Sequence, residues 1–268
     1  IIDGASYAIQ GPGGTGYGID LSSRSNVSVK NMNIRNFFRG IMLDSSSNNK
    51  ISNSDITANL FEGILVSRSS NNTLIGNNLT NNSRGIWLYY SSYNVLEGNR
   101  MSDNGQNFGV DGGYINYVDD SNTVDGKPIY YWISEKDKTV PFDAGCVILV
   151  YCEDIKVQNL MLTKNMRGIQ LIYTKNSTIT KNNITNCHDG ISLDRSSNYN
   201  NIAENNIISN RNGLFISYLS KYNVISKNKI TANYNGIIFS ESSDNKIYHN
   251  NFIDNTQQVS SDGYTNFW

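Results

Sequence analysis

A glycine followed by an apolar residue recurs along this chain at a nearly constant spacing. The steps are 22 or 23 residues within two runs, at Gly18, Gly40, Gly63 and Gly85 and at Gly145, Gly168, Gly190, Gly213 and Gly236. Gly109 lies between the runs, 24 residues after Gly85 and 36 before Gly145, and we assign it to the same column. A fixed period of this length indicates a repeat protein in which each repeat is one supersecondary unit.

Each repeat contains three short apolar segments, such as residues 41–43, 51 and 56. The segments have the period of two that is typical of strands, and Ser/Asn clusters such as residues 45–49 separate them. A leucine-rich repeat would need a Leu consensus, and a propeller blade would need about 40 residues. The sequence therefore predicts an all-β fold, a right-handed, single-stranded parallel β-helix with about ten coils of 22–23 residues and three short strands per coil.

Bulk properties limit the other possibilities. We expect one domain over residues 1–268, with a long insertion at about 111–144, and we expect it to be one module of a longer protein. The net charge of −1 gives no electrostatic case for nucleic acid or anionic lipid, and no apolar stretch is long enough to span a membrane. The three cysteines have neither an even count nor a CxxC spacing, so they indicate buried thiols.

The repeated positions have structural explanations. The first and third residues after each glycine are apolar and should fill the tube, and the glycine should supply a bend or a left-handed conformation. Asparagines at matching places should stack as amide ladders, namely Asn31, Asn53, Asn77, Asn99, Asn159, Asn182, Asn205, Asn228 and Asn250. Arg39, Glu62 and Arg84 should form a second ladder, with surface attractions below about 1 kcal/mol.

Catalytic carboxylates should gather at outward positions of adjacent coils, and the sequence offers two weak candidates. Asp20 and Asp44 are offset by one coil and could form an acid/base pair. His188, Asp189, Asp194 and Arg195 form the second group, which we interpret as a solvated turn. We therefore expect no catalytic site, while leaving an enzyme as the alternative.

The outward positions are unexpectedly apolar. We predict that a stripe on one sheet contacts a partner or carbohydrate, formed by Met42, Leu65, Trp87, Tyr89, Phe215 and Ile238 with Ile148, Val150 and Ile172. The insertion, with Tyr130, Tyr131 and Trp132, should fold over its middle. Tyr and Trp suit both protein and sugar contacts, so self-association, other cell-surface proteins and polysaccharide are the expected partners.

The recurrent pattern Gly-Ile-x-Leu-x-x-Ser-x-x-Asn-x-Ile, as in residues 63–74, and the stretch 121–132 carry a resemblance to a known family. The chain resembles NosD-like or CASH (carbohydrate-binding and sugar-hydrolase) β-helix proteins over nearly its whole length, most closely the archaeal secreted surface type. The resemblance implies the fold, but not an activity, because the family contains enzymes and non-enzymes.

The NosD label implies copper handling, but two histidines, five methionines and scattered cysteines form no ligand cluster, so we expect no metal and no cofactor. Calcium stays an open alternative because of five acids in the insertion, although the GGxGxD nonapeptide is absent: Asp119, Asp120, Asp125, Glu135 and Asp137.

These observations predict a secreted, extracellular or cell-surface protein that serves as a sheath, S-layer, filament or adhesion component through protein and carbohydrate contacts. The alternative is a polysaccharide lyase, hydrolase or epimerase. Six sequons are glycosylation candidates, at Asn26, Asn71, Asn78, Asn81, Asn176 and Asn183.

Overall fold

The computed structural model describes all residues, 1–268, as strands and turns with no helix. The chain forms two compact units, residues Ile1–Ile129 and Tyr130–Trp268. Their boundary falls within the insertion predicted at about 111–144. The single domain over residues 1–268 stays a prediction.

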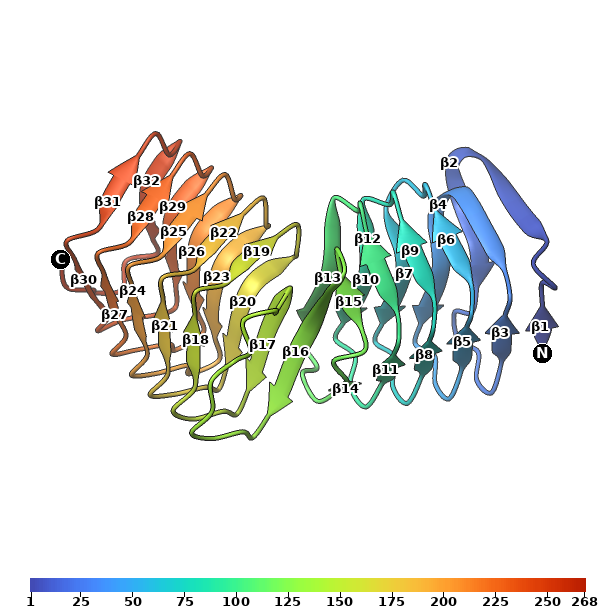
Figure 1. Ribbon diagram of the computed structural model, residues 1–268, viewed down its shortest axis with the longest axis horizontal. Coiled ribbons are helices and arrows are strands. Elements are labelled where there is room, and N and C mark those ends of the chain that lie inside the picture. The colour runs from blue at the N-terminus through green and yellow to red at the C-terminus, as the bar shows by residue number, and fades with distance from the viewer. The chain divides into compact units, whose positions relative to one another are not determined.

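The first unit stacks its strands into three faces (Figure 1). One face contains β1 (Ile2–Asp3), β3 (Ser28–Lys30), β5 (Lys50–Ser52), β8 (Thr73–Ile75), β11 (Val95–Glu97) and β14 (Tyr117–Val118). The long strands β2 (Ala8–Asp20) and β4 (Asn33–Asp44) turn a corner and contribute to both other faces. The second face adds β6 (Asp55–Thr57), β9 (Asn78–Thr80), β12 (Arg100–Ser102) and β15 (Thr123–Val124), and the third adds β7 (Glu62–Ser67), β10 (Arg84–Tyr89) and β13 (Gln106–Asp111).

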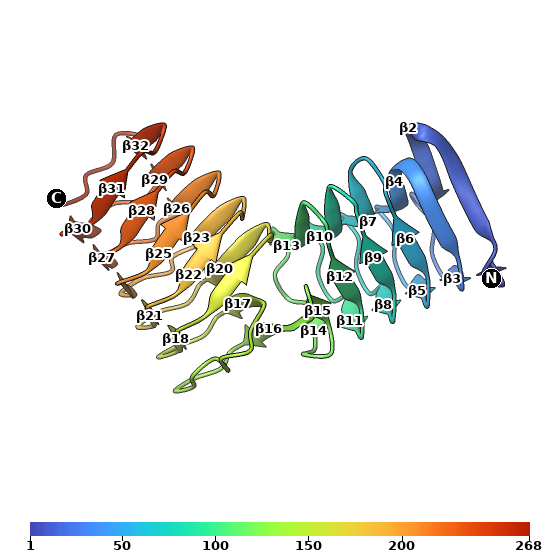
Figure 2. The ribbon, with the colours of Figure 1, turned by 45° about the horizontal axis from the view of Figure 1, so that its top comes forward.

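The second unit repeats the three faces, and Figure 2 shows its strands in successive coils. The face on which the candidate site lies contains β17 (Cys146–Val150), β20 (Arg167–Ile172), β23 (Asp189–Asp194), β26 (Asn212–Ser217), β29 (Asn235–Ser240) and β32 (Gln257–Ser261). The next contains β18 (Lys156–Gln158), β21 (Thr178–Thr180), β24 (Asn201–Ala203), β27 (Val224–Ser226) and β30 (Lys246–Tyr248). The last contains β19 (Met161–Thr163), β22 (Asn183–Thr185), β25 (Asn206–Ile208), β28 (Lys229–Thr231) and β31 (Asn251–Ile253).

Neighbouring coils pair in parallel, which confirms the predicted right-handed parallel β-helix. The coil count exceeds the ten that carry a glycine signal. The pairing of Ile237 with Val259 places Gln258, in β32, opposite Gly236. This coil has no glycine at that position, so the sequence period did not reveal it.

The recurring glycines do not adopt the left-handed conformation that the sequence suggested. A Cβ atom on Gly40 would lie 2.4 Å from Ile56 Cγ2 and 2.5 Å from the carbonyl oxygen of Gly63. The position therefore requires glycine because the core and the next coil leave no room for a side chain.

Gly109 and Gly145 were assigned wrongly to this column. The pairing of Ile86 with Phe108 places Asn107 opposite Gly85, and the pairing of Val147 with Ile169 places Cys146 opposite Gly168.

Buried asparagines form three amide ladders in each unit instead of the one predicted. In one of them, Nδ2 of Asn182, Asn205 and Asn228 donates to Oδ1 of the next asparagine along the axis at 2.9–3.0 Å. The backbone N–H groups of the same residues donate to the same oxygens at 3.0 Å. Three predicted members do not belong: Asn31, Asn53 and Asn159 directly precede the ladder position and adopt φ of 54°, 50° and 57°.

Most of the insertion continues the stack of coils. Its first part supplies β14 and β15, which continue two faces of the first unit in parallel with β11 and β12. The strand β16 (Lys127–Ile133) then pairs antiparallel with β15. Tyr130 and Trp132 of β16 pack against the hydrophobic core of the second unit. Tyr131 is 7% exposed. Tyr130 and Trp132 therefore lie partly against core, and Tyr131 is buried.

Candidate functional site

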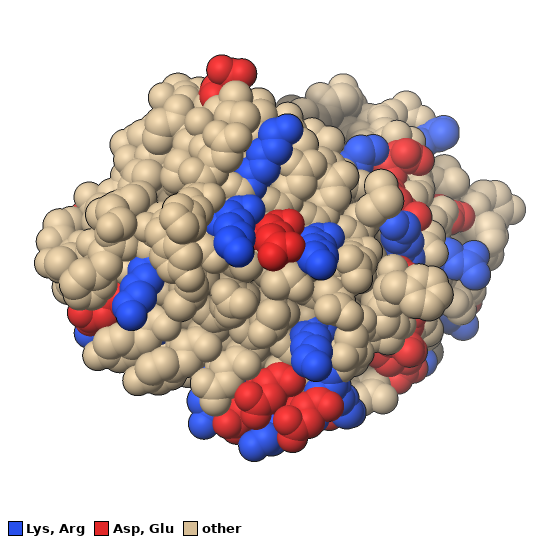
Figure 3. Space-filling view, turned by 60° about the vertical axis from the view of Figure 1, so that its left-hand side comes forward, with Lys and Arg blue, Asp and Glu red and all other residues tan.

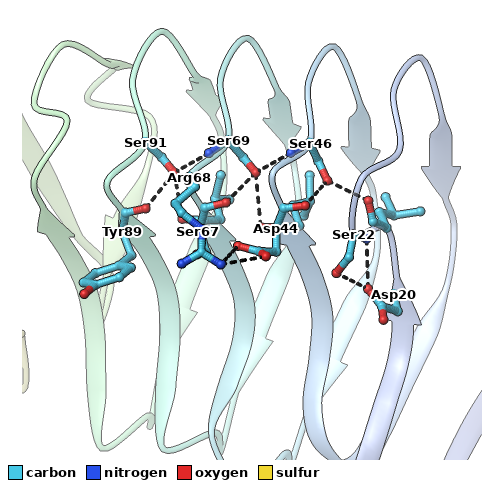
Figure 4. Close-up of polar contacts among 12 residues, drawn as sticks. Asp20, Ser22, Asp44, Ser46, Ser67, Arg68, Ser69, Tyr89 and Ser91 are labelled. Atoms are coloured by element: carbon cyan, nitrogen blue, oxygen red, sulfur yellow. Dashed lines mark hydrogen bonds and ion pairs between the residues drawn. The ribbon is translucent and has the colours of Figure 1, made fainter.

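The two acids proposed as an acid/base pair in the first unit are held separately (Figure 4). Asp20 Oδ1 accepts hydrogen bonds from the backbone N–H and the hydroxyl of Ser22 at 2.9 and 2.5 Å. Asp44 forms an ion pair with Arg68, with Nη2 2.7 Å from Oδ1. No contact joins the two carboxylates in Figure 4. Each acid has a local structural role, and the pair does not form.

A column of serines beside these acids has an equally structural role (Figure 4). The backbone N–H of Ser46 donates to Ser69 Oγ at 2.9 Å, and that of Ser69 donates to Ser91 Oγ at 3.0 Å. The three hydroxyls in turn donate to backbone carbonyls of the same turn or of the preceding coil. The column fixes the turn and leaves no activated hydroxyl.

The outward apolar residues of the first unit stack in the predicted register, but not all of them are exposed. Met42, Leu65 and Trp87 are direct neighbours on β4, β7 and β10. Leu65 is only 6% exposed between its two neighbours. Trp87 donates from Nε1 to Asp111 at 3.0 Å, and the Arg84 guanidinium lies 4.4 Å from its ring centroid. The exposed stripe is therefore interrupted, because these side chains cover one another.

In the second unit the stripe is interrupted again, because Ile148, Val150 and Ile172 are buried. Phe215 and Ile238 are neighbours in register and are half-buried. They are the part of the predicted stripe that borders a groove.

The predicted ladder of Arg39, Glu62 and Arg84 forms, but it is not a surface feature. Arg39 Nε lies 2.5 Å from Glu62 Oε2, and Arg84 Nη1 lies 2.7 Å from Glu62 Oε1. Glu62 is fully buried, whereas both arginines are partly exposed. Removing one partner of this buried carboxylate should therefore cost more than the sub-kilocalorie value expected for a surface pair, because it leaves a charge without compensation.

The second unit carries a groove of about 330 Å³ on its β17–β32 face, near the edge at which these strands begin. We name it the second-unit groove; its lining residues are Arg167, His188, Asp189, Arg211, Asn212, Phe215, Asn235 and Ile238. Four of them form a column in register, because Arg167, Asp189, Asn212 and Asn235 begin β20, β23, β26 and β29. The column occupies the position directly before the recurring glycine, like Arg39, Glu62 and Arg84 in the first unit.

Asp189 is the buried centre of this groove. Its carboxylate lies 3.3 Å from Arg167 Nε and 2.9 Å from His188 Nδ1, and it accepts from Asn212 Nδ2 at 2.7 Å. Burial raises the pKa of Asp189, but the hydrogen bond from His188, the charges of Arg167 and His188, and the hydrogen bond from Asn212 outweigh burial and lower the pKa overall. Asp189 is therefore ionised at neutral pH.

The predicted cluster around His188 divides between the two ends of β23. His188 and Asp189 lie in the groove at its beginning. Asp194 ends the strand and accepts from Ser217 Oγ at 3.2 Å, and the Arg195 guanidinium lies 4.7 Å from the Tyr218 ring centroid. The interpretation as a solvated turn is wrong for Asp189 and Asp194, which are 1% and 8% exposed and lie in β23.

Sequence reasoning missed Arg167, Arg211, Asn212 and Asn235. The signal that could have found Arg167, Asn212 and Asn235 is the position directly before each glycine, which the sequence did reveal as Arg39, Glu62 and Arg84, whereas Arg211 lies one residue earlier and carries no such signal. In the second unit this column mixes Arg, Asp and Asn, so no single residue type marks it.

Metal donors do not converge elsewhere in either unit, and no group of three or more His, Cys, Asp or Glu is present. Burial raises the pKa of the Cys187 thiol to about 12 and raises the pKa values of Cys146 and Cys152. Among the acids considered for calcium, Asp119 and Asp125 accept hydrogen bonds within the first unit, and Glu135 pairs with Lys138 in the second. Asp120 belongs to the first unit and Asp137 to the second.

The net charge of −1 gives little long-range attraction for a polyelectrolyte. Figure 3 shows a mostly uncharged face with Lys or Arg and Asp or Glu in small mixed groups. No helix is present that could cross a membrane. Four of the sequon asparagines are exposed turn residues, namely Asn26, Asn71, Asn81 and Asn176, whereas Asn78 and Asn183 lie half-buried on β9 and β22.

Two family models match the chain. The model described as a right-handed β-helix region matches residues 17–140, and the model described as periplasmic copper-binding protein (NosD) matches residues 110–268. No curated protein matches the sequence.

Solved β-helix structures are similar at low identity. The A-module of the mannuronan C-5 epimerase AlgE4 from Azotobacter vinelandii is 14% identical, with a TM-score of 0.41, over 97% of this chain and 80% of that one. DFA-IIIase from Arthrobacter chlorophenolicus A6 is 12% identical, with a TM-score of 0.41, over 85% of this chain and 55% of that one. The chain thus spans about half the length of that enzyme, and similarities this distant do not assign a chemistry. The NosD model, in contrast, covers more than half of the sequence, so the chain belongs to the NosD family of β-helix proteins.

Proposed function

We propose that the protein is an extracytoplasmic carbohydrate-contact module that holds an acidic polysaccharide in the second-unit groove. The observation that carries the proposal is the lining of this groove. Two arginines, Arg167 and Arg211, and a single carboxylate, Asp189, line it, so the groove has an excess of one positive charge. Beside them lie the amides of Asn212 and Asn235 and the half-buried Phe215 ring.

These residue types match the groups that a uronic acid chain presents. A guanidinium binds a carboxylate through two parallel hydrogen bonds. Asparagine amides donate and accept, as sugar hydroxyls do. An aromatic ring provides an apolar surface for the carbon face of a sugar. Because the chain's net charge is only −1, we expect selectivity to arise from contacts in the groove rather than from long-range attraction.

The family description names copper, and the residues of this chain do not fit it. Copper sites use imidazole, thiolate or thioether ligands that converge on one point. His188 is engaged with Asp189, and His249 lies beside Tyr248, with ring centroids 5.3 Å apart. The three thiols are buried, and their raised pKa values oppose the thiolate form that binds metal. We therefore derive no role for copper in this chain.

We place this module outside the cytoplasm, as an adhesion or structural component of a cell surface or sheath. The family description as periplasmic supports export. The four exposed sequons, at Asn26, Asn71, Asn81 and Asn176, are accessible to glycosylation there. Self-association and contacts with other surface proteins belong to the same proposal.

Calorimetric titration with defined oligosaccharides tests the binding. We expect binding of oligouronates, no binding of neutral glucans of equal length, and a loss of at least about tenfold in affinity for Arg211→Gln, because a charge-assisted hydrogen bond is worth about 1.5–3 kcal/mol. Lys229→Gln is the matched control, since it removes one exposed positive charge from β28, outside the groove. Equal weakening by both variants, or equal binding of neutral and acidic sugars, would contradict the proposal.

A carbohydrate-active enzyme is the second candidate function. The contact between His188 and Asp189 inside the groove favours it, because a carboxylate that orients a histidine is a common element of acid–base catalysis.

A further inference from the structure

We propose that His188 is a general base that removes the proton from the carbon next to the carboxylate of a uronic acid bound in the second-unit groove. This inference rests on the proposed function, because it needs an acidic sugar in that groove. It goes beyond binding, because it assigns a reaction step to a residue of this chain.

The contact of His188 with Asp189 determines which ring nitrogen can accept the sugar proton. Asp189 is ionised and can only accept, so His188 Nδ1, 2.9 Å away, carries the proton of their hydrogen bond. In the neutral ring Nε2 then has the lone pair. His188 lines the groove, and no protein donor or acceptor is in contact with Nε2. The ring therefore has its basic nitrogen available to a ligand.

Asp189 acts as a positioning residue. It is 1% exposed, and contacts with Arg167 and Asn212 fix its carboxylate. This carboxylate holds the imidazole in one tautomer and stabilises the positive charge that forms when Nε2 accepts a proton.

The arginines supply the other requirement of the step. A proton next to a carboxylate is hard to remove, because the electron pair left behind adds charge to a group that is already negative. A guanidinium that binds the carboxylate stabilises this developing charge. Arg211 is exposed and forms no ion pair with a protein carboxylate, whereas Arg167 lies against Asp189. Arg211 is thus the residue that we assign to the sugar carboxylate.

Groups within the groove account for the proton and the electron pair of this step. The C5–H bond of the uronate breaks, the proton moves to His188 Nε2, and the electron pair moves into the carboxylate to give an enediolate. Return of a proton to C5 from His188 regenerates the sugar and the neutral imidazole. No oxidant, metal or further reactant takes part. In heavy water the His188 proton exchanges with solvent, so the returning hydrogen is deuterium.

The same residues argue against direct glycoside hydrolysis. That reaction requires two carboxyl groups that flank the scissile bond. Asp189 is the only acid of the groove, and it is buried with partners on three sides. The groove has a base and a carboxylate binder but no pair of acids.

Deuterium incorporation at C5 tests the proposal. The full chain is incubated in heavy water with an oligouronate that calorimetry shows to bind, and loss of the C5–H signal is followed by proton NMR. We expect incorporation by the unmodified protein and a decrease of about 10²–10⁴-fold for His188→Gln, because general bases contribute rate factors of this size. The affinity of this variant should change less than threefold. Incorporation at the same rate in His188→Gln would overturn the assignment.

Two further outcomes separate this inference from the proposed function. If the unmodified protein binds the oligouronate but incorporates no deuterium, the base assignment is wrong and the binding function stands. If no acidic oligosaccharide binds, the proposed function itself fails. Asp189→Asn provides a check on positioning: the exchange rate at saturation should fall while the affinity is kept or increased, since the groove gains positive charge. Loss of both rate and affinity would assign Asp189 a merely structural role.

Discussion

Replacing Asn205 by alanine tests how much one rung of an amide ladder contributes to folding. The side chain is 1% exposed and takes part in five hydrogen bonds. Its oxygen accepts from the backbone N–H and from Nδ2 of Asn182, and its Nδ2 donates to Ile179 O, Ala203 O and Asn228 Oδ1. The substitution leaves the buried Asn182 N–H and one Asn182 amide hydrogen without an acceptor.

A buried polar group without a partner costs about 1–3 kcal/mol, so we expect the free energy of unfolding to fall by about 3 kcal/mol. Urea denaturation followed by circular dichroism measures this change. Asn201→Ala, at an exposed position four residues earlier, is the matched control and should change stability by less than about 0.5 kcal/mol. Asn205→Ser should be intermediate, because Ser54 occupies the same ladder position in the first unit and accepts from Met32 N. A loss below about 1 kcal/mol for Asn205→Ala would refute the ladder as a main source of stability.

Three other predictions concern buried charges and thiols. Glu62→Gln should lower the free energy of unfolding by about 3 kcal/mol, measured by urea denaturation. This value is at the low end of the cost of breaking a buried ion pair, because both guanidinium groups reach solvent. An unchanged midpoint of urea denaturation would contradict this. Because the pKa of Asp189 is lowered in the folded state, its contribution to stability should be complete above about pH 4 and lost as the pH falls below that value. Urea denaturation at several pH values measures this loss. If Asp189→Asn lost as much stability on acidification as the unmodified protein, the prediction would be contradicted. Cys146 and Cys187 should not react with a thiol reagent at pH 8 unless the protein is unfolded, and rapid reaction of the native protein would show that the thiols are accessible.

The fold could be predicted because one steric requirement recurs. Residues such as Gly40 must be glycine where the backbone meets the core and the next coil, and this need repeats in nearly every coil. The prediction failed in the coils that carry another residue at the glycine position. Asn107, Cys146 and Gln258 occupy the glycine position in their coils, so the sequence period was misplaced at 109 and 145 and missed the last coil.

The candidate site was harder to predict, because its residues share a position but not a residue type. His188 and Asp189 were noticed as neighbours in sequence, whereas Arg167 and Asn212 reach Asp189 only through strand pairing. Asn31 and Asn77 show the opposite problem: the same residue type serves as a left-handed turn in one place and as a ladder rung in the other. Composition could not separate the two roles, since register decides them.

A crystal structure of the protein with a bound oligouronate would show directly whether the second-unit groove holds an acidic sugar. We expect a sugar ring in the second-unit groove, with its carboxylate within hydrogen-bonding distance of the Arg211 guanidinium and its carbon face against Phe215. Electron density for the sugar only outside this groove, at a ligand concentration that saturates binding in solution, would contradict the account.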